Sequence, residues 1–444
     1  MKLSIKSILT VTFAGILLAG CSDDDKMPAN PEIPVATSPA SDMVIYEANP
    51  RLYANDNCLA ALTARLDDIK ALGTTVLWVM PVNTPGEKDA VGSPYCVRDF
   101  KGVNPKYGTM ADFKALVDAA HAKGMRVILD WIANHTSWDN AWITAHPDWY
   151  THDSNGNIIS PEGMGWDDVA DLNYDNADMR AAMIDAMKYW VTEGSIDGFR
   201  CDHADGVPHD FWTAAITALR GINPDLLMLA ETSDPEFFND GFDMFYGWAF
   251  ASKLKDLFAG KITGTALVTE SAKETAKLPE GKQVLRYAVN HDTAAESSLT
   301  TLYGGEEATI AAYVVAAMMD GVPMIYSSQE TSYPGTMSFF NYNPLSWPGT
   351  HAAAYRAIDK AYRESAAVRG GELRGFENGR VATFARISGE NTLLVMVNTT
   401  SSDIEAKVPI TYAGETMTDM LSGDASAMPV AVTLPAYGYR IWLK

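Results

Sequence analysis

Residues 196–231 read IDGFRCDHADGVPHDFWTAAITALRGINPDLLMLAE, and this stretch decides the fold. A largely apolar run ends at Asp202, a helical pattern follows over 209–219, and a second apolar run fills 226–231. Buried parallel strands have this continuous apolar character and are joined by crossover helices. The stretch therefore predicts one strand–helix–strand unit of an α/β protein.

The same alternation extends over most of the chain. Strand-like runs are expected at 43–47, 75–80, 126–130, 196–202, 226–231, 242–246, 284–290 and 323–326. Helical patterns are expected at 59–72, 111–123, 177–193, 209–219, 305–319 and 351–368. Eight strands alternating with helices favour a closed (β/α)8 barrel over 43–369 rather than an open doubly wound sheet, and no nucleotide-type Gly-rich turn follows any strand.

Two regions depart from this repeat. A long segment after the third strand, about 136–173, predicts a small insertion that carries four tryptophans: Trp138, Trp142, Trp149 and Trp166. Loops at the carboxyl ends of barrel strands build active sites, so these side chains either line a binding site or pack the insertion's own core. Beyond 370 the pattern alternates with period two, which predicts an antiparallel β-sandwich over 370–444.

Composition limits the partners that the protein can take. The chain has 444 residues, of which 47% are hydrophobic, and a formal net charge of −22. This charge repels polyanions, so nucleic acid is excluded as a partner and a neutral substrate is favoured. Cys58, Cys96 and Cys201 form neither a disulfide framework nor a zinc site by their spacing, and a Cys58–Cys96 pair stays open.

The first 20 residues are typical of an export signal. Lys2 and Lys6 precede an apolar run, 8–19, that is too short to span a bilayer. The run ends LAGC at 18–21, which resembles the lipobox of bacterial lipoproteins. That resemblance implies removal of 1–20 and acylation of Cys21, while an ordinary signal peptide is the alternative.

The segment that follows is predicted to be a flexible, acidic and Pro-rich tether over 21–42. Its SDDD at 22–25 resembles the tag of lipoproteins displayed on Gram-negative cells. We therefore expect an exported protein, held at the outer membrane or cell surface only through its N-terminal lipid.

Carboxylates occupy one strand end after another. Asp130 ends the third predicted strand, Asp202 the fourth and Glu231 the fifth, and Asp292 follows the seventh. In a parallel barrel these ends converge on one mouth. Acids without a function more often scatter over solvent-facing helices, so this placement predicts a carboxylate-based active site.

Strand alternation sharpens that prediction. Arg200 and Asp202 share one face of their strand, and Cys201 faces the other way, toward the helices. An arginine beside a carboxylate favours its charged form, as a nucleophile requires. Glu231 follows the apolar run LLMLA, and desolvation there is expected to raise its pKa and keep a proton available. A glycosidase requires two carboxyl groups in these two different states.

Residues 43–444 resemble the α-amylase family of glycoside hydrolases. DWIANH at 130–135 is similar to its first motif, GFRCD at 198–202 to the second, and VNHD at 289–292 to the fourth. Glu231 stands where the third motif has its acid, and DLN at 171–173 resembles the motif that closes the family's inserted domain.

The resemblance implies a role for each matching residue. Asp202 would be the nucleophile, Glu231 the general acid/base, and Asp292 would stabilise the distorted sugar. Arg200 would hold Asp202 and pair with Asp130. Three further residues would bind the glucose at the bond to be cut: Tyr95 by stacking, and His135 and His291 by hydrogen bonds. His203 is expected to point outward with a structural role.

A structural Ca²⁺ between barrel and insertion is also implied, with Asn134 and Asp171 as ligands. Many α-amylases carry a Lys-His pair where this chain has Asp205 and Gly206, and the backbone carbonyl of that histidine helps to bind calcium. A Gly206 carbonyl would have to replace it.

The implied activity is retaining endo-hydrolysis of α-1,4-glucosidic bonds in starch-like α-glucans and maltooligosaccharides. Exo-acting α-glucosidases of the family usually have an aspartate after the stacking tyrosine, where this chain has Cys96. The alternatives are an α-glucosidase, a cyclodextrinase or a transglycosylase, or a non-catalytic glucan-binding lipoprotein. Proteins of the last kind typically lack one of the three acids, and this chain has all three.

Overall fold

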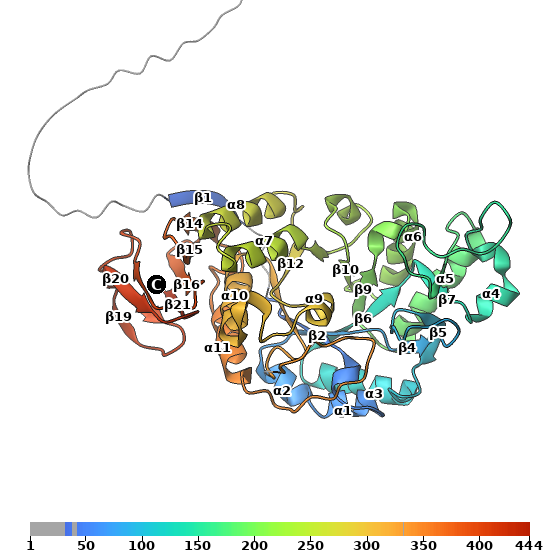
Figure 1. Ribbon diagram of the computed structural model, residues 1–444. Coiled ribbons are helices and arrows are strands. Elements are labelled where there is room, and N and C mark those ends of the chain that lie inside the picture. Colours follow the sequence, from blue (N-terminus) through green and yellow to red (C-terminus); the bar gives the residue numbers. More distant parts are fainter. Residues whose placement is uncertain (1–31, 38–41, 332) are drawn as a thin grey trace, which may run out of the picture.

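Eight parallel strands close into a barrel in the computed structural model, which describes residues 32–37, 42–331 and 333–444 (Figure 1). Around the barrel they are β2 (Ile45–Ala48), β3 (Val76–Val79), β6 (Arg126–Ile132), β9 (Gly198–Asp202), β10 (Leu227–Ala230), β11 (Met244–Tyr246), β12 (Gln283–Tyr287) and β13 (Val322–Tyr326). β13 pairs with β2 and closes the ring. The predicted (β/α)8 barrel and all eight of its strands are confirmed.

Helices surround the barrel. They are α1 (Cys58–Thr63), α2 (Leu66–Ala71), α3 (Met110–Ala122), α5 (Ala177–Thr192), α6 (His209–Arg220), α7 (Trp248–Phe258), α8 (Gly264–Thr275), α10 (Glu306–Met319) and α11 (Ala352–Glu364). The short helix α9 (His291–Glu296) follows the seventh barrel strand, at its carboxyl end. The sequence prediction omitted α7 and α8, between the sixth and seventh strands. In α8 the buried face includes the polar residues Thr265, Ser271 and Glu274, which hides the apolar period.

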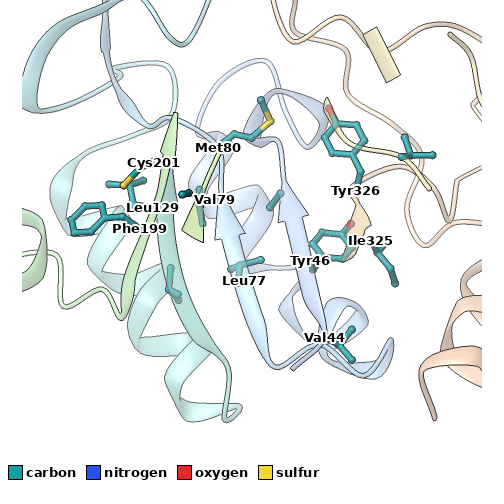
Figure 2. Packing of buried hydrophobic residues seen from close by; sticks show 14 of the residues in the cluster. Val44, Tyr46, Leu77, Val79, Met80, Leu129, Phe199, Cys201, Ile325 and Tyr326 are labelled. Atoms are coloured by element: carbon teal, nitrogen blue, oxygen red, sulfur yellow. The ribbon is translucent and has the colours of Figure 1, made fainter. Parts of the chain in front are cut away.

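Side chains on the barrel strands alternate between two buried layers. Trp78, Leu229 and Leu285 belong to the layer that fills the barrel interior. Leu77 and Cys201 belong to the larger layer between strands and helices, part of which Figure 2 shows. The predicted orientation of Cys201 toward the helices is therefore confirmed, and by the same alternation Arg200 points to the interior side.

The insertion after the third barrel strand contains β7 (His135–Ser137), α4 (Ala141–Ala145), the 3₁₀ turn η2 (Pro147–Trp149) and β8 (Val169–Asp171). β7 pairs antiparallel with β8, so that His135 lies opposite Asp171. A hairpin of β4 (Asn83–Pro85) and β5 (Val97–Val103) follows the second barrel strand. These loops lie at the carboxyl ends of the strands, where the site is expected.

The C-terminal region forms an antiparallel sheet with the order β1-β14-β15-β16-β21-β18-β19. Its strands are β1 (Glu32–Thr37), β14 (Glu372–Phe376), β15 (Val381–Ser388), β16 (Asn391–Asn398), β18 (Thr416–Asp419), β19 (Ala425–Ala427) and β21 (Tyr439–Leu443). A second sheet of β17 (Ile404–Lys407) and β20 (Ala431–Leu434) packs on it around a core that includes Leu394, Leu434 and Trp442. This confirms the predicted C-terminal antiparallel β-sandwich.

β1 corrects the predicted tether. Residues 32–37 fall inside the segment 21–42, yet they pair antiparallel with β14 at the edge of the C-terminal sheet. An edge strand tolerates proline because one side of its backbone needs no partner, and the proline content of the segment hid this strand. The predicted signal peptide and Cys21 lie outside the described residues.

Figure 1 shows β1 and the C-terminal sheet at one end of the molecule and α4 of the insertion at the other. Among the described residues, none of the helices combines the length and the apolar character that crossing a bilayer requires.

The three cysteines of the folded region are buried free thiols, so the Cys58–Cys96 pair that the sequence left open does not form. The Sγ atom of Cys58 donates to the Ala54 carbonyl, and that of Cys96 donates to the Asp168 carbonyl. Burial raises the pKa of Cys58 to about 11 and that of Cys96 to about 12, so neither is a reactive thiolate.

Candidate active site

A cleft of about 1050 Å³ opens at the carboxyl ends of the barrel strands. Six of the seven predicted catalytic and substrate-binding residues line it: Tyr95, His135, Asp202, Glu231, His291 and Asp292. The seventh, Arg200, is fully buried. The barrel thus brings together residues that are up to 197 positions apart in the chain, the acids predicted from strand ends and the others predicted from the family resemblance.

Arg200 connects three carboxylates at the base of the cleft. The pairing of β6 with β9 puts Asp130 beside Arg200. The Arg200 Nη1 atom lies 2.8 Å from an oxygen of Asp130 and 2.8 Å from an oxygen of Asp202, and Nη2 lies 2.7 Å from Glu231 Oε1. One guanidinium therefore holds two of the three predicted catalytic carboxylates, Asp202 and Glu231, close together.

Aromatic rings enclose this guanidinium. Its Cζ atom lies 5.2 Å from the ring centroid of Trp78, 5.9 Å from Tyr95 and 5.7 Å from Tyr246, and Arg200 Nε donates to the Tyr246 hydroxyl. Trp78 Nε1 donates to Asp130. These contacts exclude water, which strengthens the electrostatic interactions of Arg200 with its carboxylates.

Glu231 has the properties of a general acid. Burial raises its pKa to about 7; Arg200 opposes the shift and the charge of Asp202 adds to it. Its Oε2 atom accepts the backbone N–H of His203 at 2.7 Å. The desolvation inferred from the preceding apolar strand is therefore present, and a proton is available near neutral pH.

His291 belongs to a buried polar chain. Its Nδ1 atom lies 2.5 Å from Glu47 Oε1, and its Nε2 atom lies 3.0 Å from the hydroxyl of Tyr95, which donates to Asp130. Burial lowers the pKa of His291, but Glu47 and then Asp292 outweigh this effect and bring it to about 9. His291 is therefore positively charged at neutral pH.

Sequence analysis missed Glu47. It lies in the first barrel strand, which makes it a strand-end carboxylate like Asp130 and Asp202. The signal that identified the other acids would also have found it.

His135 differs from His291 in charge. Burial lowers its pKa to about 4, so the imidazole is neutral and offers one donor and one acceptor. Asp292 lies in the first turn of α9 and accepts from Asn290 Nδ2. Its side chain is 52% exposed, so it can reach a sugar in the cleft.

The expected outward orientation of His203 is wrong. Its side chain lines the cleft, and its backbone is left-handed (φ +42°). This turn directly after Asp202 redirects the next side chain, which a period-two pattern cannot predict. A non-glycine residue in this conformation is uncommon, and such strain concentrates at functional sites.

The insertion tryptophans divide between the two alternatives. Trp142 and Trp149 pack together at 5.1 Å, and Trp138 donates to the Asp167 carbonyl. Trp166 lines the cleft, edge-on to the rings of His135 and His203.

The predicted calcium ligands have suitable donor chemistry. Asn134 is 5% exposed, and its Oδ1 atom accepts no hydrogen bond within the described part of the chain. Burial raises the pKa of the Asp171 carboxyl, which lies across the β7–β8 pair from His135. A Cβ atom on Gly206 would lie 2.6 Å from Asn134 Oδ1, so the Gly206 backbone approaches this oxygen closely. Oxygen donors from three separate segments fit Ca²⁺, which would join barrel to insertion.

Comparison with known proteins identifies the family. Residues 53–161 and 163–392 match the family profile "Alpha amylase, catalytic domain", and 376–441 match "Maltogenic Amylase, C-terminal domain". With the barrel and its carboxylates, these matches define a glycosidase. The chain belongs to the α-amylase family.

Individual relatives agree with this assignment. The chain is 27% identical over 410 residues to the α-amylase MalA of Haloarcula japonica, covering 87% of this chain but only 59% of that protein. It resembles the crystal structure of an α-amylase from Lactobacillus plantarum with 28% identity and a TM-score of 0.81, covering 91% of this chain and 99% of that chain. It also resembles the crystal structure of a maltogenic α-amylase from Thermotoga neapolitana with 26% identity and a TM-score of 0.79, covering 91% of this chain and 98% of that chain.

Proposed function

We propose that this glycosidase cuts α-1,4-glucosidic bonds inside starch-like α-glucans and maltooligosaccharides with retention of configuration. The observation that carries the proposal is the contact of Asp202 and Glu231 with one buried guanidinium. Retaining enzymes need their two carboxyl groups only ~5–5.5 Å apart, and a shared cation favours such closeness.

In the first step an oxygen of Asp202 attacks the anomeric carbon while Glu231 gives its proton to the glycosidic oxygen. The bond between these two sugar atoms breaks, the leaving sugar departs as an alcohol, and a glycosyl ester to Asp202 remains. In the second step Glu231 takes a proton from water, which attacks the anomeric carbon and breaks the ester. The raised pKa of Glu231 suits both halves of this cycle.

Endo action is supported by the cleft lining. Val91, Phe340 and Trp248 are exposed apolar residues of the cleft. Val91 and Phe340 lie in loops after the second and eighth barrel strands, and Trp248 is the first residue of α7, which follows the sixth. Apolar surface contributed by three separate segments of the cleft suits a glucan chain that passes through the site. Cys96, in place of the aspartate of exo-glucosidases, is engaged with a backbone carbonyl.

The test is a time course on soluble starch followed by iodine staining, reducing ends and proton NMR. We expect staining to fall faster than reducing ends accumulate, with the α-anomer formed first. If no reducing sugar forms, the protein is a non-catalytic glucan-binding protein. If the β-anomer forms first, the enzyme inverts configuration.

Release of maltose is the second candidate function, because residues 376–441 match the C-terminal domain of maltogenic amylases. In that case maltose accumulates from the first time points while iodine staining persists. The same time course therefore separates the two candidates.

We also propose that acylation of Cys21 anchors the exported protein to a membrane. β1 follows Cys21 in the sequence and joins the C-terminal sheet, which lies at the end of the molecule away from the insertion (Figure 1). The anchor would therefore put the C-terminal sheet nearest the lipid. The variant Cys21→Ala should be lost from the membrane fraction. If the variant associates with the membrane as the parent does, the proposal of a lipid anchor at Cys21 is wrong and residues 1–20 are an ordinary signal peptide.

A further inference from the structure

Trp166 is an aromatic residue of the cleft that the mechanism above does not use. It lies in the insertion, before β8, and lines the cleft. Its ring centroid is 5.2 Å from that of His203 and 5.5 Å from that of His135, at interplanar angles of 81° and 62°. Two edge contacts therefore orient the indole.

The contact with His203 puts one edge of the indole near Glu231, while the contact with His135 puts it next to the glucose at the bond to be cut. An acid must reach the glycosidic oxygen, so the leaving sugar lies beside Glu231. The backbone N–H of His203 donates to Glu231 Oε2, and the His203 ring contacts Trp166. The ring of Phe339, which also lines the cleft, contacts Tyr95 and His291 instead.

The His203 ring is itself held in place. Its Nδ1 atom lies 3.2 Å from Asp205 Oδ1, and a Cβ atom on Gly206 would lie 2.6 Å from its Nε2 atom. Gly206 thus permits the ring to pack against the backbone. Asp205 and Gly206 are the two positions at which this chain departs from the Lys-His pair of many α-amylases, so its contacts to the leaving sugar must come from other residues.

We propose that Trp166 is the platform on which the leaving glucose packs, with His203 as its positioning residue. One face of a glucopyranose ring presents C–H groups that pack on an indole. Within the described part of the chain the Nε1 atom of Trp166 donates to no group, so it is available to a sugar hydroxyl in the cleft. The proposal rests on the glycosidase function and adds that Trp166 controls whether a sugar, rather than water, accepts the glycosyl group.

The test compares two substrates on Trp166→Ala. Maltopentaose has a leaving sugar, whereas α-maltosyl fluoride has none. We expect kcat/KM on maltopentaose to fall about tenfold, and kcat/KM on the fluoride to stay within about twofold of the parent. Transfer from the fluoride to added maltose should also fall, and Trp166→Phe should restore part of both losses.

Two further variants sharpen the result. Trp142→Phe, in the same insertion but packed on Trp149 and Phe100, should leave both rates unchanged. His203→Asn keeps the backbone N–H and tolerates the left-handed turn. It should raise KM for maltopentaose more than it lowers kcat.

If kcat/KM of Trp166→Ala falls equally on both substrates, or falls on neither, the proposal that Trp166 is the platform is wrong. A parent protein inactive on both substrates would instead overturn the proposed function, so the two failures are distinguishable.

Discussion

Arg200 and Arg286 are both fully buried arginines on barrel strands, yet they have different partners. Arg200 on β9 contacts three carboxylates at the mouth of the barrel. Arg286 on β12 forms an ion pair with Glu274 of α8, and its Nε atom donates to the Asp320 carbonyl.

The side of the strand accounts for this difference. Leu285 and Tyr287 face the barrel interior, so Arg286, between them, points outward and attaches α8 to the barrel. Burial and residue type are the same at both positions. The carboxylates at neighbouring strand ends therefore favour a role in the site for Arg200, and the partner on a covering helix favours a structural role for Arg286.

The largest effect on activity is expected from the two carboxylates that contact Arg200 and line the cleft, Asp202 and Glu231. Asp202→Asn removes the proposed nucleophile, so turnover on starch should fall by about four orders of magnitude or more. Glu231→Gln removes the proton for the leaving oxygen and should cost about 10²–10⁴-fold. Because fluoride needs little protonation, Glu231→Gln should recover most of its kcat/KM on α-maltosyl fluoride, and Asp202→Asn should not.

Near-native starch activity in both variants would mean that these carboxylates are not the catalytic groups. A reversed contrast on the fluoride would mean that the two roles are exchanged.

Removing each arginine tests the comparison directly. Arg286→Met leaves Glu274 buried without its cation and should lower the free energy of unfolding by about 3–5 kcal/mol, with kcat/KM retained. The double variant Arg286→Met/Glu274→Leu should recover most of that loss. Arg200→Met should cost similar stability but also abolish activity. Urea denaturation and starch kinetics measure both quantities, and an activity loss in Arg286→Met equal to that in Arg200→Met would remove the distinction.

Local patterns predicted the barrel and its carboxylates because strand ends in a parallel barrel meet at one mouth. They did not predict the Glu47–His291 contact, which joins residues 244 positions apart. They also failed at His203, because the left-handed turn breaks the alternation on which the prediction rested. β1 was missed because the prolines of its segment are typical of a tether, and its backbone partner lies in the distant C-terminal sheet.

A bound Ca²⁺ would join the barrel to the insertion, as Arg286 joins α8 to the barrel. If Asn134 and Asp171 bind Ca²⁺, chelation should lower Tm and added calcium should restore it. At a calcium concentration of 100 Kd the expected stabilisation is roughly 2.7 kcal/mol. Asn134→Leu should abolish the response. Calorimetry with and without chelator measures it, and an unchanged melting curve after thorough chelation would exclude a structural ion.

The smallest expected effect is a pH dependence of kcat/KM, which tests how strongly Arg200 lowers the pKa of Glu231. Desolvation raises the pKa of Glu231 to about 7 although Arg200 opposes the shift. In the proposed role of general acid Glu231 must start protonated, so kcat/KM on maltopentaose should fall as pH rises through about 7, tenfold per unit well above it. The sign is the same for stability: the contribution of protonated Glu231 is fully present below its unfolded pKa of ~4.3 and is lost as pH rises through about 7. On α-maltosyl fluoride, which needs little acid assistance, this basic limb should flatten. A basic limb of equal steepness and midpoint on both substrates would assign it to another group, whereas a limb that begins near pH 5 would mean that Arg200 outweighs desolvation and keeps Glu231 ionised.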